Sequence, residues 1–491
     1  MANIQLALPV EIWSKILDYL PPDQCRQLRL ANRFFFHLTG RQIYKRLFVT
    51  GYDQPTKHLL KAINSLCLGH HVQSLRIQPW IVAPLVQSQP RRRRERVSSA
   101  FQQVYSFFDS AYPTRKAQAL QNERLNKQIQ IVTETIRKLP HVREYTVDWD
   151  VDRPYHSQLF TAVLTLLNVT PFSQTLTTLT LTVPVDRLVC LAPVHLPALE
   201  ELSVCFVTQG LSQRYIDDCL DSFIFFLDNL YKTLRSLSIC STHRSPHLNL
   251  SKFFHNLSSA FFPRLHSFAL RIPYDGSHLP RDTNGIENLR AFISKHGRII
   301  HHLKLSAFPR PSIRTSPSDP MGKYWIQGTL SGPGFAESLT ALTSLELSIR
   351  PLRSDLDPFL TFLSSVNHRL DSLALLDDPL TPEEVVRVLD TLSLHSPSYL
   401  RHLSIRLQYL SPCTLDRLAS RLACLKSLRL TFGDIKSSHC DEKNDLWLSR
   451  LGRELVSLFR FLIIAIPDST YPPLPKILPS VPRPSHTIAD H

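Results

Sequence analysis

One stretch decides the fold: Leu342-Thr343-Ser344-Leu345-Glu346-Leu347. Its pattern, apolar-x-x-apolar-x-apolar, recurs eleven times along a chain of 491 residues. The last apolar positions of each segment alternate with polar ones, as in a strand that has one buried face. Such self-similarity is typical of a repeat architecture. We therefore expect each segment to form one strand of a single extended sheet.

Most segments are separated by enough chain for a helix. The eleven segments occupy residues 72–77, 142–147, 176–181, 199–204, 234–239, 265–270, 300–305, 342–347, 370–375, 400–405 and 425–430. Thr381-Pro382-Glu383-Glu384 marks one helix start, with a hydroxyl N-cap, a proline at the first helical position and a glutamate at the third. Ser411-Pro412 marks another just ahead of the last segment. This predicts parallel strands on one side and helices on the other.

The pattern resembles the leucine-rich repeat family over roughly residues 72–435. The resemblance implies an α/β solenoid with a concave parallel sheet and a helical convex side. Two features depart from the family. Strand starts lie 23 to 70 residues apart, compared with about 20–29 in the family. The Asn or Cys that normally follows each strand is replaced, for example by Trp80, Asp150, Thr242 and Gln408, so we expect the turns to satisfy their backbone groups differently.

A segment of another kind precedes the repeats. Residues 9–20 carry Ile12, Ile16, Leu17 and Leu20 on one face of a helix of about three turns. Pro21 ends this helix, a second helix begins at Pro22-Asp23, and a third is expected around residues 43–47. Three short helices form a thin core, so some of the apolar side chains should face a partner.

This N-terminal segment resembles the F-box, with Leu8-Pro9-x-Glu11, Ile16-Leu17 and Leu20 followed by Leu28-x-Leu30-Ala31-Asn32-Arg33. The resemblance implies binding to the Skp adaptor of SCF ubiquitin ligases and, through it, to a cullin. The contact positions that it carries over are Leu8, Pro9, Ile12, Ile16, Leu17, Leu20, Leu28 and Phe35, the last at a place where many members have tryptophan. The alternative is that these residues only cap the first repeat, because terminal repeats need caps.

Motifs for enzyme chemistry are absent from the sequence. It has no phosphate-binding glycine loop, no His-Glu-x-x-His and no Gly-x-Ser-x-Gly, and only 13 glycines. Among 21 histidines, the adjacent pairs His70-His71 and His301-His302 would point to opposite faces of a strand. We therefore expect a non-catalytic protein with no metal and no cofactor.

Charge and cysteine content indicate which cellular compartments suit this chain. The net charge of +15 comes from 56 basic and 41 acidic residues, and the only dense run is Arg91–Arg96. This run fits a nuclear signal, a nucleic-acid patch or a solvated loop. Nine cysteines without a Cys-x-x-Cys pair indicate reduced thiols. With no secretory signal and no membrane-length apolar run, we expect a cytoplasmic or nuclear protein that does not bind membranes.

The polar positions of the strands should form the concave face, which is the usual binding surface of a solenoid. Most are serine or threonine, and the basic exceptions are Arg271, His302, Lys304, His402, Arg406 and Arg429. These six side chains suit an acidic or phosphorylated segment of a protein target. The alternative is that they serve solubility.

The expected domains are an F-box at residues 1–50, a helical linker at 51–71, an irregular solenoid at 72–466 with a helical insert at 84–139, and a proline-rich disordered tail at 467–491. The function that follows is substrate recognition for an SCF-type ubiquitin ligase. Two alternatives stay open: an F-box scaffold outside ubiquitination, and a basic solenoid associated with nucleic acid. The sequence does not name the target protein.

Overall fold

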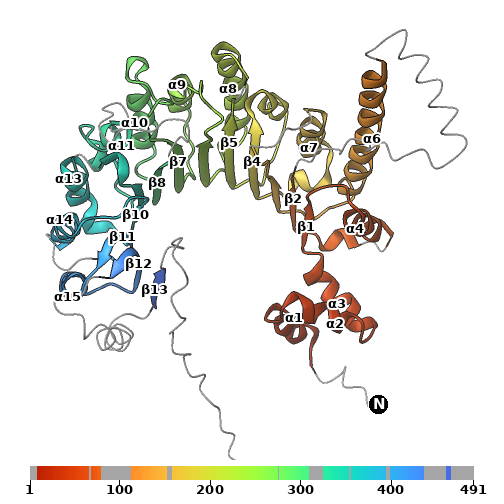
Figure 1. Ribbon diagram of the computed structural model, residues 1–491, viewed down its shortest axis with the longest axis horizontal. Coiled ribbons are helices and arrows are strands. Elements are labelled where there is room, and N and C mark those ends of the chain that lie inside the picture. Colours follow the sequence, from red (N-terminus) through yellow and green to blue (C-terminus); the bar gives the residue numbers. More distant parts are fainter. Residues whose placement is uncertain are drawn as a thin grey trace, which may run out of the picture.

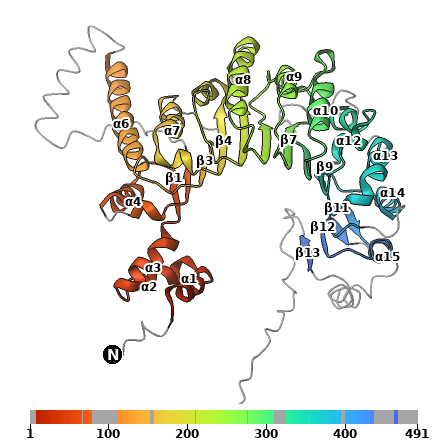
Figure 2. The same cartoon turned by 180° about the vertical axis from the view of Figure 1, so that it is seen from behind.

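The structure, a computed structural model, describes residues 8–65, 68–78, 112–151, 157–208, 210–274, 276–308, 324–352, 355–393, 399–435 and 461–465. In these residues thirteen strands form one sheet, in which each strand pairs in parallel with the next strand along the chain. The sheet lines the inner side of an arch and the helices cover its outer side (Figures 1 and 2). This confirms the predicted α/β leucine-rich repeat solenoid.

The strands are short and similar in length. They are β1 (Arg46–Val49), β2 (Ser74–Ile77), β3 (Glu144–Val147), β4 (Thr178–Pro184), β5 (Glu201–Val207), β6 (Ser236–Ser241), β7 (Ser267–Pro273), β8 (His302–Phe308), β9 (Ser344–Ser348), β10 (Ser372–Leu376), β11 (His402–Leu410), β12 (Ser427–Ile435) and β13 (Phe461–Ala465). The eleven predicted segments correspond to β2 to β12. The terminal strands β1 and β13 were missed, although Tyr44-x-x-Leu47-x-Val49 has the same spacing.

The elements between the strands vary much more. The outer α-helices are α4 (Gln54–Ser65), α6 (Tyr112–Ile136), α7 (Ser157–Val169), α8 (Gln213–Asp228), α9 (Ser251–Ser259), α10 (Gly285–Lys295), α11 (Tyr324–Leu330), α12 (Phe335–Ser338), α13 (Asp357–Val366), α14 (Pro382–Ser393) and α15 (Pro412–Arg421). The 3-10 helices are η2 (Leu68–His71), η3 (Pro171–Gln174), η4 (Val185–Leu191), η5 (Arg281–Thr283), η7 (Arg350–Leu352) and η8 (Asn367–Arg369). The narrow gap between β4 and β5 holds only η4, whereas the wide gap between β2 and β3 includes the 25-residue α6. The irregular spacing of the strands in the sequence therefore reflects the different lengths of the helices and loops that connect one strand to the next.

Two rows of apolar side chains run along the sheet beneath the helices. Leu303 of β8, Leu345 of β9 and Leu373 of β10 lie opposite one another in register and are buried. The second row lies two residues further along each strand. Burying one leucine contributes about 1.5–3 kcal/mol, and a slip of one residue would turn a strand's whole row toward solvent. The apolar spacing therefore sets the register.

A ladder of backbone hydrogen bonds joins the repeats at the N-terminal ends of the strands. In each repeat, the carbonyl oxygen of the residue before the strand accepts two N–H groups of the next repeat, at 2.7–3.1 Å. The accepting residues are Lys45, Gln73, Arg143, Thr177, Glu200, Arg235, His266, His301, Thr343, Asp371 and Arg401. We call this ladder the carbonyl spine. It needs no particular side chain, so the sequence does not reveal it.

At the C-terminal ends of the strands, individual polar side chains form hydrogen bonds with backbone groups. In the family pattern, an Asn or Cys after each strand has this role. The Asp377 carboxylate accepts the N–H groups of Ile349 at 2.9 Å and Arg350 at 3.2 Å. The buried Ser245 hydroxyl donates to the carbonyl oxygen of Phe206 at 2.8 Å. This agrees with the expectation that backbone groups in the turns are satisfied differently from the family pattern.

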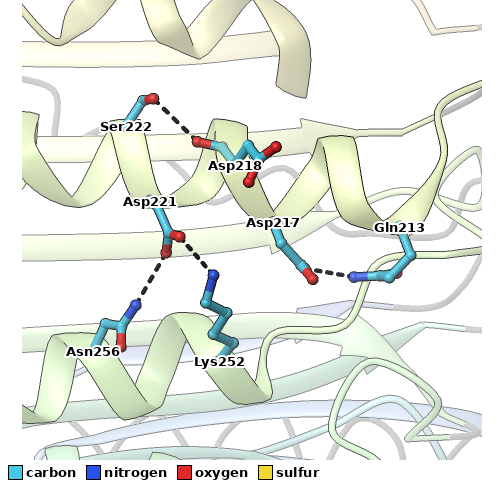
Figure 3. A network of polar contacts seen from close by, with 7 residues as sticks. All are labelled: Gln213, Asp217, Asp218, Asp221, Ser222, Lys252 and Asn256. Atoms are coloured by element: carbon cyan, nitrogen blue, oxygen red, sulfur yellow. Dashed lines mark hydrogen bonds and ion pairs between the residues drawn. The ribbon is translucent and has the colours of Figure 1, made fainter.

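Both predicted helix starts are confirmed. Thr381 and Glu384 form a reciprocal capping box: the Thr381 N–H donates to the Glu384 carboxylate at 2.7 Å, and the Glu384 N–H donates to the Thr381 hydroxyl at 3.3 Å. Ser411 caps α15 by accepting the N–H of Thr414. Polar bonds also join neighbouring outer helices. Figure 3 shows Asp221 of α8 between Lys252 and Asn256 of α9, 2.6 Å from the lysine Nζ.

A helical module precedes the sheet and consists of α1 (Val10–Asp18), α2 (Pro22–Arg29) and α3 (Arg33–Ile43). The Asn32 side chain begins α3 by accepting the N–H of Phe35 at 2.9 Å. The prediction of a helix around residues 43–47 was wrong, because α3 ends at Ile43 and Leu47 is buried in β1. The sheet thus starts inside the expected F-box range of 1–50. The arginine run and the proline-rich tail lie outside the described residues.

Gly297 gives a test of the packing between repeats. A Cβ atom there would stand 2.3 Å from the carbonyl oxygen of Ser338 and 2.7 Å from its carbon. We predict that Gly297→Ala lowers the free energy of unfolding by about 1–3 kcal/mol, because backbone must move to admit the methyl group. Urea denaturation measures this. Gly51→Ala is the matched control, since its Cβ would meet nothing within 4 Å. Equal midpoints for the two variants would contradict the close approach.

His296, at the end of α10, is buried in one defined protonation state. Its Nε2 accepts the N–H of Phe262 at 3.0 Å, so the ring proton is on Nδ1, which donates to the carbonyl oxygen of Phe292 at 2.8 Å. Burial lowers the pKa of His296 below its usual 6.5. The hydrogen bond to the Phe292 carbonyl oxygen opposes this in part, and the nearby Lys295 charge adds to the lowering. The folded chain therefore keeps the ring neutral.

We predict that the stability due to this neutral ring is fully present above pH 6.5 and declines as the pH falls. Below 6.5 the unfolded chain binds a proton at His296 that the folded chain does not, which favours unfolding. Thermal midpoints at pH 7.5 and 5.0 measure the change. His296→Gln should show a smaller drop than the parent, whereas His255→Gln, at an exposed position of α9, should show the full drop. The same drop in all three proteins would rule out this role of His296.

Candidate functional site

The N-terminal module exposes large apolar side chains. On α1 and just before it, Leu8, Ile12 and Ile16 are 40%, 41% and 37% exposed. Pro9 is also exposed. Two further side chains that sequence reasoning missed, Tyr19 and Leu30, are 89% and 88% exposed. Both stand in the last turn or at the cap of a short helix, where periodicity says little about exposure. Exposed apolar side chains on neighbouring short helices make this module a candidate interaction surface.

Other predicted contact residues belong to the interior of the module. Leu17 is only 2% exposed, so its contribution to any partner contact is indirect. Phe35 is half-buried and packs edge-to-face against Trp13, with ring centroids 5.2 Å apart. Leu20 and Leu28 are half-buried as well. These side chains hold the helices that present Leu8, Ile12 and Ile16.

The module lies at one end of the arch, below β1 and α4 (Figures 1 and 2). It joins the sheet directly, because β1 starts three residues after α3 ends. Thr39, Gly40 and Tyr44 are buried at this junction. The end of α3 therefore packs on the solenoid, whereas α1 keeps an exposed face.

The second candidate surface is the concave face of the sheet. Its polar side chains are also aligned by register, and one row reads across six strands: Ser236, Ser267, His302, Ser344, Ser372 and His402. The sheet thus presents rows of hydroxyl groups interrupted by a few charges. Such a face suits binding of another molecule by hydrogen bonds.

The structure divides the six predicted cationic residues into two groups. The first group is Arg271 of β7 with His302 and Lys304 of β8. Lys304 is paired with Glu346 of β9, an acidic neighbour that sequence reasoning missed. Burial, together with His301 and His266, lowers the pKa of His302, which favours its neutral form. Arg271 remains the exposed cation of this group, with its guanidinium 5.6 Å from the ring centroid of Phe308.

The second group is His402 and Arg406 of β11 with Arg429 of β12. Arg406 donates to the carbonyl oxygen of Asp377 at 3.0 Å, and His402 Nε2 lies 3.9 Å from the Asp371 carboxylate. Arg429 is exposed and stands opposite Ser404. Strands β9 and β10 separate the two groups, so the cations do not form one continuous patch.

Two cysteines adjoin Arg271 on the concave face. Cys205 of β5 pairs in register with Cys240 of β6, which pairs with Arg271. A hydrogen bond between the thiols, aided by the arginine charge, lowers the pKa of Cys240, while the same bond and burial raise that of Cys205. Both are free thiols. The sequence does not reveal their pairing, because the two cysteines lie on different strands and are far apart along the chain.

Among the described residues, no group of three or more His, Cys, Asp or Glu side chains is arranged to hold a metal ion. Every helix in the described part of the chain is too short or too polar to traverse a lipid bilayer.

Comparison with known proteins gives similarity of fold. No protein-family model and no curated protein matches this sequence. Among solved structures, a leucine-rich repeat-containing protein of Legionella pneumophila, LegL7, is 13% identical, with a TM-score of 0.33 over 72% of this chain and 99% of that one. A chain of the yeast Rad7 and Elc1 complex is 13% identical, with a TM-score of 0.37 over 72% of this chain and 97% of that one.

The concave cations give a testable prediction. If they hold an acidic or phosphorylated segment, reversing Arg271 and Arg429 together to glutamate should abolish capture of the target. Each reversal replaces a charge-assisted bond of roughly 1.5–3 kcal/mol by repulsion. Quantitative mass spectrometry of proteins that co-purify with each variant measures capture. Arg214→Glu, on the outer helix α8, is the control, and unchanged recovery with the double variant would mean that these cations serve solubility.

Proposed function

We propose that this chain is the substrate-recognition subunit of an SCF-type ubiquitin ligase. In this proposal the α1–α3 module is an F-box that binds a Skp-type adaptor and, through it, a cullin. The concave face of the solenoid binds the target protein. Catalysis belongs to other subunits, and this chain positions the target for ubiquitin transfer.

One observation carries the proposal: four of the eight F-box positions, those on α1 and just before it, are exposed. They are Leu8, Pro9, Ile12 and Ile16. Leu8, Pro9 and Ile12 do not pack against the repeats, as they would if they only capped the solenoid. Leaving several large apolar side chains in water is unfavourable, at about 25 cal/mol per Å². A partner helix that covers them would recover this free energy. The coincidence of motif and exposure supports adaptor binding.

The solenoid supplies the other half of the proposed function. In its concave sheet, the carbonyl spine joins strands β1 to β12 in sequence, and two buried apolar rows anchor these strands from beneath. This sheet is also polar and carries exposed cations, such as Arg429, that form no ion pair with the residues that the structure describes. A surface of this kind distinguishes partners by hydrogen bonds and charge rather than by apolar area. This supports recognition of one face of a folded target or of a short acidic segment.

We predict that Ile12→Asp with Ile16→Asp weakens adaptor binding at least about 100-fold. Two buried isoleucines contribute roughly 1.5–3 kcal/mol each, and 1.4 kcal/mol corresponds to a factor of ten. Calorimetry of the full chain with a purified Skp adaptor measures the dissociation constant. Phe225→Asp is the matched control, because Phe225 is 67% exposed on α8, far from the module.

The same proteins separate the possible roles. Co-purification of adaptor and cullin with the parent, lost in the double variant but kept in Phe225→Asp, supports the ligase role. Adaptor without cullin indicates a scaffold outside ubiquitination. Binding of neither protein refutes the proposal, and salt-sensitive binding of RNA or DNA in its place identifies a nucleic-acid-associated solenoid.

A further inference from the structure

A cavity of about 410 Å³ lies where the N-terminal module meets the first repeats. Its walls come from four parts of the chain: α3, η2 and the residues that precede β2 and β3. The side chains that form them are Arg41, His70, His71, Gln73, His141 and Arg143. Thr175, just before β4, completes the lining. None of these seven described residues has an acidic or apolar side chain.

The backbone under the cavity is held in place. Gln73 and Arg143 are consecutive members of the carbonyl spine, and the Arg143 N–H donates to the Gln73 carbonyl oxygen at 2.7 Å. The carbonyl oxygen of Arg143 in turn accepts the N–H of Thr177 at 2.8 Å. The Thr175 hydroxyl donates to the Phe172 carbonyl oxygen at 3.3 Å. Three of the lining side chains therefore start from fixed positions, which lowers the entropic cost of binding.

The module contributes the opposite wall. Gly40 of α3 lies against His71: a Cβ atom on Gly40 would stand 3.9 Å from the histidine Nε2. The rings of His70 and His71 are packed together, with centroids 3.8 Å apart. Arg41 follows Gly40 directly. The cavity thus lies between the end of α3 and the N-terminal ends of strands β2, β3 and β4.

The chemistry of the lining selects an anion. Arg41 and Arg143 bring two permanent positive charges to one cavity, and none of its described lining residues carries a carboxylate. Both arginines are exposed, so solvent screens their repulsion in part, and an anion between them would interact favourably with both charges. Their guanidinium groups offer forked pairs of N–H donors that match phosphate oxygens. The Gln73 amide and the His141 imidazole add further polar groups to the lining. The same charges disfavour a metal ion, and the volume is within the range of about 300–1,000 Å³ typical of ligand sites.

We propose that this cavity binds a phosphate ester. The phosphoryl group would lie between Arg41 and Arg143, with the histidines and Gln73 around it. A ligand held from both walls would fix the N-terminal module against the first repeats. This proposal goes beyond the proposed ligase function and holds whether or not the module binds an adaptor.

Two sources of phosphate fit this chemistry: a free phosphate compound and a phosphorylated side chain of a protein. Calorimetry of the full chain at constant ionic strength tests both, with inorganic pyrophosphate in one arm and a phosphoserine peptide in the other. The unphosphorylated peptide is run alongside. We expect saturable binding of at least one phosphate probe and none of the unphosphorylated peptide.

Variants locate the binding. Arg143→Gln and Arg41→Gln should each weaken binding of the phosphate probe at least tenfold, whereas Arg143→Lys should retain part of it. Arg235→Gln is the matched control, because Arg235 holds the equivalent spine position before β6, lies outside the cavity and is 3.5 Å from Glu200. It should leave the dissociation constant within twofold. Thermal midpoints without ligand show that each variant is folded.

The outcomes are distinct. Binding of pyrophosphate that depends on both arginines supports the site and assigns it to free phosphates. Binding of the phosphopeptide alone supports the site and assigns it to phosphorylated proteins. Failure of both probes to bind, or equal weakening by Arg235→Gln, overturns the proposal. Because adaptor binding is measured separately with Ile12 and Ile16 variants, the two proposals fail independently.

Discussion

This solenoid depends on one repeated pair of hydrogen bonds. In it, the backbone carbonyl oxygen of the residue before a strand accepts two N–H groups from the following repeat. It recurs from Lys45 to Arg401 with distances of 2.7–3.1 Å, and it fixes where each strand begins relative to the last. Once that position is set, the residues at equal distances from the spine fall into rows. Leucines at the second and fourth strand positions meet beneath the helices, and hydroxyl groups at the first and third meet on the concave face. The same strand register therefore aligns both the apolar rows of the core and the polar rows of the concave face.

This constraint also explains how the chain tolerates uneven repeats. The spine and the strand register concern only six or seven residues in each repeat. The path back to the next strand is free to be a 3-10 helix such as η4 or a long helix such as α6. Where a turn leaves N–H groups unpaired, a single side chain satisfies them, as Asp377 does after β9. Buried backbone groups must find partners, but the partner need not be the same residue type in every repeat.

The two interaction surfaces differ in physical character. The N-terminal module exposes isoleucine and leucine, which favour a permanent partner that covers them. The concave face exposes hydroxyl groups and isolated charges, several of them already engaged: Lys304 with Glu346, and Arg406 with the Asp377 carbonyl. Apolar area gives binding free energy, whereas fixed polar groups give selectivity. Under the proposed function, the module would hold the adaptor and the concave face would select the target. The basic cavity lies where the two parts meet.

Much of this protein was determined by sequence alone. Periodic leucines fixed eleven of the strands, because a half-buried strand needs alternation, and capping residues at Thr381 and Ser411 marked helix starts through local bonds. The same periodicity identified the apolar face of α1. Tertiary structure alone decided which apolar residues of the module are covered, as with Leu17 and Ile16, and which concave cations are neutralised by neighbours such as Glu346. It also gathered Arg41, His70 and Arg143 around one cavity. These outcomes depend on contacts between residues tens of positions apart, which local spacing does not encode.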